Sequence, residues 1–312
     1  MLHLFNNFSN KMIESARKGV GVSKTSAGKI VLSIVKIALN YAWCVFIMAL
    51  SLILVAGVTL LINKEIAQTV FKSEFSANLI SIVGIFMAYV ISTKVEKLDK
   101  TALGIDIGKK KIISKYIVGV LLGLVMFGLS FGFGYVTEAF KFVGVNYEST
   151  VIAIVLSVIG FIIQGIFNTL FFKSYALNTL SKHLKLVPAV LISSALFSLS
   201  YLITMEFSIL PLLNLFLLGI LTSCIVLLTD NIWIAAALHS GWNIAQGTIC
   251  GFNVVGNETE TSLMFFKGVR SEIISGGAFG PDGGLIVTCI LLIATIIAMW
   301  LMIRKSEENQ KI

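Results

Sequence analysis

Apolar residues in this chain gather into long runs separated by short polar segments. A helix that crosses the roughly 30 Å hydrocarbon core of a bilayer needs about 20 apolar residues. Runs of about this length lie at 37–63, 77–93, 112–135, 150–172, 187–205, 209–228, 231–250 and 284–303. The pattern therefore predicts about eight transmembrane helices in one bundle.

The composition supports this assignment. Of the 312 residues, 57% are hydrophobic and only 13% are charged, and the mean hydropathy is +0.94. A soluble domain could not bury so much apolar surface. With only three prolines and with 26 glycines, the chain suits long helices with small residues at their contacts better than a barrel. The predicted fold class is all-α, with a cytoplasmic or interfacial segment 1–36, a transmembrane bundle 37–303 and a tail 304–312.

Loops that are rich in basic residues alternate along the chain with loops that contain few. Basic residues are concentrated before the first run, in the segment 94–115, in the turn after the fourth run and in the tail, whereas the loops between them contain few. Because loops rich in Lys and Arg stay in the cytoplasm, both termini are predicted to be cytoplasmic. The long outer loop, about 251–283, ends in the glycine-rich SGGAFGPDGGL. We expect that stretch to form a re-entrant or capping turn before the last helix.

The distribution of the net charge of +8 matters more than its sum, because it follows the topology, and membrane lipids are the expected partners. The basic segment 94–115 should be attracted to anionic headgroups, and it lacks the interleaved aromatic residues that a nucleic-acid role would need, so no nucleic acid is expected. The cysteines lie in or beside apolar runs without CxxC spacing, at Cys44, Cys224, Cys250 and Cys289. We therefore expect packing residues, not a disulfide or a metal site.

Polar residues inside the membrane are concentrated in the second half of the chain. In lipid such side chains need protein partners, so they mark helix contacts or a site. On the fourth run the polar residues recur four or five positions apart, on one side of the helix that should face the bundle interior; they are Gln164, Asn168, Thr169 and Lys173. The fifth run carries Ser194, Ser198 and Tyr201 beside Phe197.

The sixth and seventh runs add three more polar positions. Asn214 lies alone among leucines, and His239 and Asn243 are four residues apart, so that their side chains stack on one helix face. For Gln164, Ser194 and Asn214 we expect interhelical hydrogen bonds. For His239 with Asn243, both a helix contact and a functional site stay open.

The order of these polar positions resembles the CPBP family of intramembrane proteases, also called Abi or CAAX-protease-like, whose relatives include the eukaryotic prenyl-protein endoprotease. That family has the motifs EExxxR, FxxxH and HxxxN or HxxxD on successive helices. Here NTLFFK stands at the first motif, Phe197 with Tyr201 at the second, and His239 with Asn243 at the third. The resemblance implies a CPBP-like core over about 112–303.

The family chemistry requires groups that this chain lacks at the matched positions. The resemblance implies a glutamate that activates water with the help of histidines or a bound metal. Asn168 and Thr169 cannot act as a general base, Tyr201 replaces a histidine, and Lys173 lacks the planar fork of arginine. A catalytic zinc normally has three protein ligands, whereas only His239 and a weak amide remain. We therefore expect no catalytic residue, metal or cofactor at these positions.

Three functions remain open. The leading hypothesis is an inactive pseudoprotease that binds a membrane peptide or partner membrane protein, as a scaffold, regulator or immunity factor. The six motif positions would line its cavity as hydrogen-bonding groups. The alternative is an active intramembrane metallo-endopeptidase with a displaced site and bound zinc, although neither Glu138 nor Glu206 lies at motif depth. The third is a small-molecule transporter, but no inverted repeat is visible. The resemblance also implies a multi-pass protein of a bacterial plasma membrane.

Overall fold

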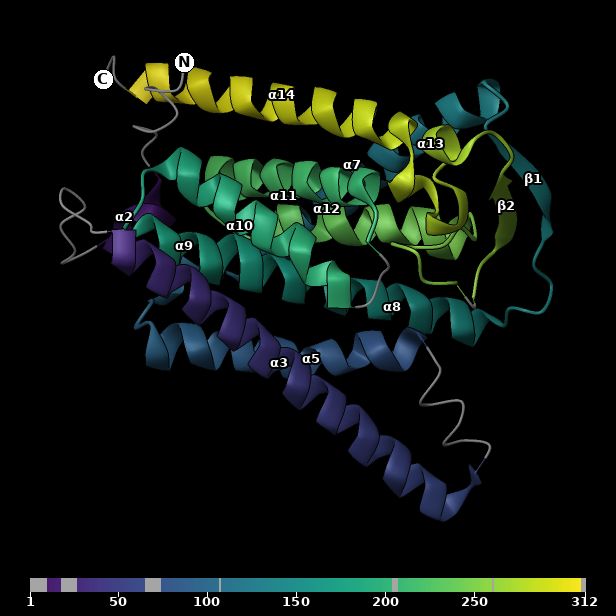
Figure 1. Cartoon of the computed structure of the whole chain (residues 1–312), viewed down its shortest axis with the longest axis horizontal. Helices are drawn as coiled ribbons and strands as arrows, with labels where there is room; N and C mark the ends of the chain where they lie inside the picture. Colours follow the sequence, from purple (N-terminus) through teal and green to yellow (C-terminus); the bar gives the residue numbers. More distant parts are fainter. Residues whose placement is uncertain are drawn as a thin grey trace.

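The computed structural model describes residues 10–17, 27–64, 74–106, 108–203, 207–259 and 261–309. It confirms an all-α helix bundle (Figure 1). The long helices are α3 (Ala27–Ile62), α5 (Glu74–Val90), α7 (Lys109–Val136), α8 (Val151–Asn168), α10 (Leu186–Ser200), α11 (Ile209–Thr229), α12 (Trp233–Asn243) and α14 (Leu285–Asn309). The short ones are α2 (Lys11–Arg17), α6 (Lys100–Leu103), α9 (Leu177–Ser181) and α13 (Glu272–Ser275).

Among the described residues, seven helical segments are long and apolar enough to cross a bilayer. They coincide with seven of the eight predicted runs. The first begins at Ala27 rather than at 37, so the predicted boundary between the N-terminal segment and the bundle falls inside α3. The extra turns are polar enough to extend beyond the hydrocarbon, because Lys29 and Lys36 lie on them. The helix thus begins ten residues before the predicted apolar run.

The eighth predicted run, 231–250, is helical but short. Helix α12 has 11 residues and continues as the π-helix η5 (Ile244–Ile249) with six, which together reach about 26 Å at 1.5 Å per residue. Its side chains from Ala235 to Asn243 are buried, and α7, α8 and α11 pack around it. A helix enclosed by other helices need not match the full bilayer thickness, and it can carry polar side chains toward protein rather than lipid.

Two glycines let the neighbouring helices approach α12 closely. A Cβ atom at Gly165 of α8 would lie 2.8 Å from the Ala236 carbonyl oxygen, and one at Gly123 of α7 would lie 2.7 Å from the Trp242 nitrogen. A larger residue at either position would force the backbones apart. Small residues at such contacts are typical of membrane bundles, in which close packing replaces the hydrophobic effect.

A two-stranded sheet at the end of the bundle opposite α2 (Figure 1) was not predicted. Strand β1 (Phe140–Val145) pairs antiparallel with β2 (Met264–Gly268), and the two strands lie in two segments that we expected to be loops. The 3₁₀ turns η6 (Gly277–Phe279) and η7 (Pro281–Gly283) lead into α14, as the glycine-rich sequence predicted. Asn214 of α11 holds this turn, since its Nδ2 donates to the Asp282 carbonyl oxygen at 2.7 Å.

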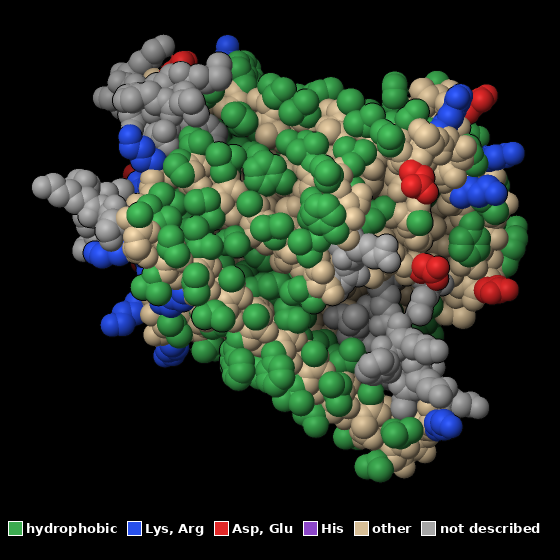
Figure 2. All heavy atoms as spheres, viewed as in Figure 1, with side chains coloured by type: hydrophobic (Ala, Val, Ile, Leu, Met, Phe, Trp, Pro, Cys, Tyr) green, Lys and Arg blue, Asp and Glu red, His purple; other side chains and the backbone are tan. Residues whose placement is uncertain are grey.

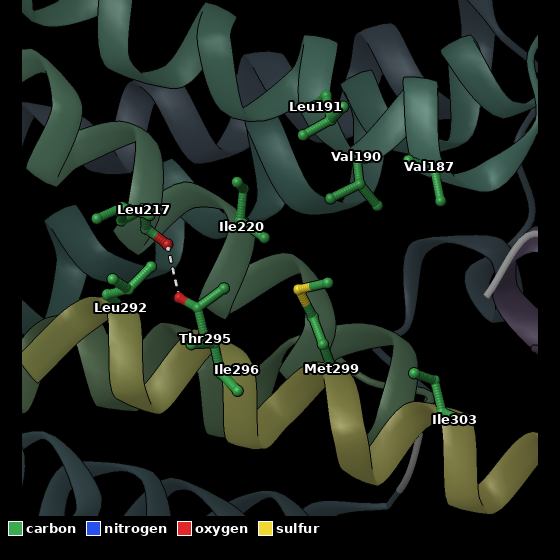
Figure 3. A pocket seen from close by; sticks show the side chains of 10 residues that line it. All are labelled: Val187, Val190, Leu191, Leu217, Ile220, Leu292, Thr295, Ile296, Met299 and Ile303. Carbon is green, nitrogen blue, oxygen red and sulfur yellow. Dashed lines mark hydrogen bonds between the residues drawn. The ribbon is translucent and has the colours of Figure 1, made fainter. Parts of the chain in front are cut away.

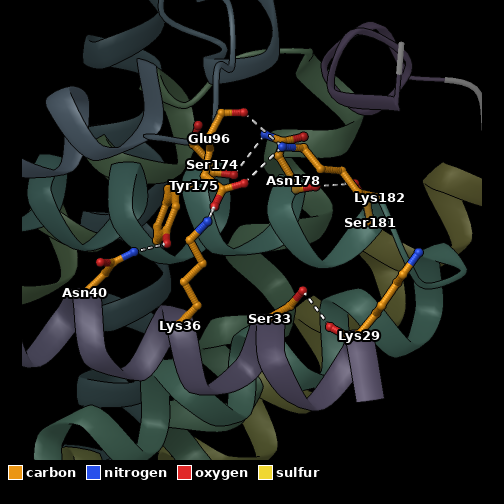
Figure 4. A network of polar contacts seen from close by, with 10 residues as sticks. All are labelled: Lys29, Ser33, Lys36, Asn40, Glu96, Ser174, Tyr175, Asn178, Ser181 and Lys182. Atoms are coloured by element: carbon orange, nitrogen blue, oxygen red, sulfur yellow. Dashed lines mark hydrogen bonds and ion pairs between the residues drawn. The ribbon is translucent and has the colours of Figure 1, made fainter. Parts of the chain in front are cut away.

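The opposite end of the bundle is basic. Figure 2 shows hydrophobic side chains along the sides of the helices and Lys and Arg at the end where α2 lies. There the Glu96 carboxylate, which follows the π-helix η2 (Ile91–Val95), pairs with Lys36 of α3 and with Lys182 at 3.0 Å (Figure 4). Asn40 of α3 donates to the Tyr175 hydroxyl at 2.6 Å (Figure 4). These contacts attach α3 to the rest of the bundle.

The four cysteines are free, as expected, but only three are buried. Cys44, Cys224 and Cys250 pack in the core, whereas Cys289 is exposed on α14. The prediction of a packing role was therefore wrong for Cys289. An apolar run in a membrane helix does not tell which of its faces is turned to lipid.

Candidate functional site

The three helical segments that carry the motif positions lie side by side. Helix α8 ends at Asn168 and continues as the π-helix η3 (Thr169–Ala176), which carries Thr169 and Lys173. Tyr201 opens the short 3₁₀ turn η4 (Tyr201–Ile203) after α10. Helix α12 packs against α8, and η3 packs against α10 and α11. The bundle thus brings together the helical segments that carry the motif positions.

All six positions are inside the protein. Tyr201 is partly buried, and none of the other five, Asn168, Thr169, Lys173, His239 and Asn243, is more than 6% exposed. The side of the fourth span that carries Asn168, Thr169 and Lys173 faces the bundle interior, as predicted. Buried polar groups of this kind require partners within the protein.

Two amides at the motif positions are hydrogen-bonded between helices. Asn168 Nδ2 donates to the Tyr201 hydroxyl at 3.2 Å, and Asn243 Nδ2 donates to Gln164 Oε1 at 3.0 Å. The first bond joins the position of the family glutamates to the position of the second-motif histidine. The second confirms the interhelical role expected for Gln164. Both amides therefore act as structural donors.

Phe197, the residue that the second motif retains, contacts three of the other positions. The Lys173 ammonium nitrogen lies 4.4 Å from its ring centroid. The His239 ring lies 5.8 Å away at 88°, and the Tyr201 ring 5.4 Å away at 88°. The Lys173 side-chain nitrogen thus lies over the ring face, and His239 packs edge-to-face against the same ring.

Lys173 and Ser194 differ from the hydrogen-bonded residues of the site. Neither the Lys173 ammonium nitrogen nor the Ser194 hydroxyl has a hydrogen-bond partner among the described residues. The expectation that Ser194 forms an interhelical hydrogen bond was therefore wrong. Gly219 of α11 leaves the space beside both, because a Cβ there would lie 3.1 Å from Lys173 Nζ and 2.9 Å from Ser194 Cβ. The site thus keeps a buried lysine nitrogen without a hydrogen-bond partner among the described residues.

A π-helix follows each amide of the site. The segment η3 begins directly after Asn168, and η5 begins directly after Asn243. Such wide turns interrupt an α-helix and are common at functional sites. Nothing in the periodicity of the sequence indicated them, because one extra residue per turn leaves the apolar pattern of a fully buried segment unchanged.

Sequence reasoning also missed a network one turn beyond His239. Trp242 Nε1 donates to Asp282 Oδ1 at 3.0 Å, Gln246 Nε2 donates to Oδ2 at 2.7 Å, and the Val255 N–H donates to Oδ2 at 3.2 Å. Burial raises the pKa of the Asp282 carboxyl above its ordinary value of 3.8, although these three bonds oppose the shift. The network fixes the outer loop on α12. The one sequence feature that pointed to this network was Asp282, the acid within the glycine-rich stretch.

The donor set at the motif positions does not fit zinc. Among the described residues, no group of three or more His, Cys, Asp or Glu side chains could hold a metal ion. His239 packs against Phe197, and the Asn243 amide is bound to Gln164. Glu138 lies in the turn before β1, with an exposed side chain 3.9 Å from Arg270, and Glu206 lies outside the described residues.

The comparisons with known proteins agree with this arrangement. Residues 150–245 match the family model described as Type II CAAX prenyl endopeptidase Rce1-like. No curated protein matches the chain. The matched stretch contains all six motif positions and Phe197, and it runs from the start of α8 through α12. Residues 150–245 of this multi-pass helical membrane protein therefore form an Rce1-like segment of the CPBP family of CAAX-protease-type proteins.

Proposed function

We propose that this protein is a catalytically inactive CAAX-protease-like protein that binds a membrane peptide or a partner membrane protein without cutting it. It would act as a scaffold, a regulator or an immunity factor. We further propose that it resides in the plasma membrane of a bacterium. The observation that carries the proposal is the hydrogen bond between Asn168 and Tyr201, which occupies two positions where the family motifs have a glutamate and a histidine.

The chemistry of the substituted side chains supports the absence of catalysis. An amide cannot accept a proton from water at neutral pH, and a tyrosine hydroxyl bound to an amide is no substitute for an imidazole. Lys173 could stabilise a developing negative charge, but its ammonium is in contact with the Phe197 ring and no activated nucleophile is present at the six positions. Loss of a single essential base costs proteases about 10⁴-fold in rate.

The retained polar cluster supports a binding role. Gln164, Asn168, Tyr201 and Asn243 keep hydrogen-bonding groups at membrane depth, where apolar side chains would pack without the cost of burying polar groups. A peptide segment that crosses the membrane offers few polar groups. Tyr201, which is partly exposed at the end of α10, would be the first residue of the cluster to contact such a segment.

One observation favours a second candidate, an active intramembrane metallo-endopeptidase. His239 and Asn243 keep the third motif, buried on one face of α12. An active enzyme of this kind would require zinc, so purified protein should contain about one equivalent of the metal, and chelation should abolish cleavage. The inactive protein that we propose should contain none.

Photocrosslinking in native membranes tests the binding proposal. A benzoylphenylalanine at position 201 should capture a membrane peptide or protein, and mass spectrometry should find the captured chain intact. The matched control places the same probe at position 199, where Leu199 is 51% exposed near the end of α10, two residues before Tyr201. If position 201 captures nothing that position 199 does not, or if the captured chain is cut beside the crosslink, the proposal is wrong.

A further inference from the structure

An apolar crevice opens on the side of the bundle away from α3. It lies between α10 and α14, with α11 as its floor (Figure 3), and α11 packs against both of the other helices. Its volume is about 330 Å³, at the lower end of the range of about 300–1,000 Å³ for small-molecule pockets. Ser194 and Gly219 meet at the α10–α11 contact, so the crevice is separate from the motif site.

The walls of the crevice are almost entirely apolar. The one side chain in the lining with a polar group is Thr295, and its hydroxyl points at the Leu217 carbonyl oxygen, 3.5 Å away (Figure 3). No polar group of the lining side chains is therefore left to recognise a polar ligand. Leu191 and Ile296 on the two rims are 42% and 57% exposed, so the crevice opens sideways, toward the hydrocarbon of the membrane.

One end of the crevice adjoins exposed basic residues. Val187 and Ile303 lie at the same end (Figure 3). Lys185 precedes Val187 by two positions at the start of α10, Arg304 directly follows Ile303 on α14, and both side chains are exposed. The Arg304 guanidinium stacks on the Trp300 ring, 4.4 Å from its centroid. An indole next to a guanidinium is typical of the level of the lipid headgroups.

We propose that this crevice holds one acyl chain of an anionic phospholipid, whose phosphate lies between Lys185 and Arg304. The apolar lining and the opening toward the membrane accommodate the chain. The basic residues at one end select the charge of the headgroup, since each basic residue near anionic lipid contributes about 1 kcal/mol. A bound lipid would then connect α10 and α14 across the gap between them.

Native mass spectrometry of the delipidated protein, with phosphatidylglycerol or phosphatidylcholine added back, tests the proposal. We expect one retained phosphatidylglycerol and about a thirtyfold preference over phosphatidylcholine, which corresponds to about 2 kcal/mol for two basic residues. Lys185→Gln with Arg304→Gln should abolish the preference. Lys141→Gln with Lys267→Gln, both exposed on β1 and β2 at the other end of the bundle, should leave it intact.

A second pair of variants tests the position of the chain. Ile220→Trp fills the floor of the crevice and should reduce retention of phosphatidylglycerol about tenfold. Ile293→Trp, on an exposed face of α14 outside the crevice, should not change it. Equal retention by the two tryptophan variants would overturn the proposal, as would equal binding of the two lipids by the wild type. So would a dimer that only Ile220→Trp dissociates, because a second copy of the chain would then be the occupant.

Discussion

Lys173 shows most clearly how a single residue of this site departs from the family pattern. An ammonium group at membrane depth normally has a carboxylate partner, and the family motif supplies two glutamates four and five positions earlier. Here these positions hold Asn168 and Thr169, and the Lys173 nitrogen lies over the Phe197 ring without a hydrogen-bond partner among the described residues. The sequence predicted the missing acids but not the ring contact, because residues 173 and 197 meet only through the packing of η3 on α10.

Replacement of Lys173 by methionine should leave the protein as stable or make it more stable, by about 1–4 kcal/mol. An apolar side chain of similar length removes the cost of burying an uncompensated charge. Thermal unfolding followed by tryptophan fluorescence in detergent measures the change. The matched control is Lys305→Met, which should destabilise, because Lys305 Nζ donates to the Leu228 carbonyl oxygen at 2.8 Å. A lower unfolding temperature for Lys173→Met would show that the ammonium has a partner that stabilises it.

Glu96 should make stability depend on pH. Burial alone would raise the pKa of Glu96, but the hydrogen bonds and charges of Lys36 and Lys182 outweigh it and hold that pKa below its ordinary value of 4.5. The stabilisation is therefore complete above the ordinary pKa and is lost as the pH falls through the lower pKa of the folded state. Asp282, with a raised pKa, has the opposite dependence.

The variant Glu96→Gln separates the contribution of Glu96 to the pH dependence of stability from that of Asp282. It should be less stable than the wild type at pH 7, and the difference in unfolding temperature should shrink as the pH is lowered below about 4.5. Melting curves of both proteins between pH 3.5 and pH 7 provide the comparison. A difference that does not change with pH would mean that the two ion pairs do not hold the carboxylate ionised.

At the scale of elements, the apolar runs predicted the existence of the helices better than their ends. The start of α3 at Ala27 was missed because Lys29 and Lys36 interrupt the apolar run there, and Lys36 is held by its pairing with Glu96. The strands β1 and β2 were missed because each is only five or six residues long and the aromatic packing of Phe140 on Phe252, which is distant in sequence, fixes them. The π-helices had no signal in the sequence.

Close packing of α8 on α12 should depend on Gly165. A Cβ there would lie 2.8 Å from the Ala236 carbonyl oxygen, so Gly165→Ala should cost about 1–3 kcal/mol by overpacking and should move Gln164 away from Asn243. Gly128→Ala on α7, where nothing lies within 4 Å of the new Cβ, should be neutral or slightly stabilising. Thermal unfolding of both variants checks this pair. Equal effects of the two substitutions would contradict the close helix contact.

At the scale of the whole molecule, the basic loops and the short helix α12 both bear on how many times the chain crosses the membrane. Seven described segments satisfy the length of a membrane span, and an odd number would place the two ends of the chain on opposite sides. In the structure α2 and the C-terminal end of α14 lie at the same end of the bundle (Figure 1). The arrangement therefore requires α12 with η5 to carry the chain across, despite its length.

Fusion reporters test this topology. Green fluorescent protein at the C-terminus should be fluorescent, as expected for a cytoplasmic end, and alkaline phosphatase there should be inactive. Alkaline phosphatase inserted after Asn257, in the outer loop, should be active. The reverse pattern at either site would contradict eight crossings with both termini in the cytoplasm.

The central claim is that the amide and hydroxyl groups at the motif positions make this CAAX-protease-like protein inactive. The most direct test compares the wild type with the variant Asn168→Glu, Thr169→Glu, Lys173→Arg and Tyr201→His, both reconstituted with zinc and given a set of membrane peptides. Mass spectrometry should detect no cleavage by the wild type and metal-dependent cleavage by the variant. Cleavage by the wild type at a rate equal to that of the variant would contradict the claim.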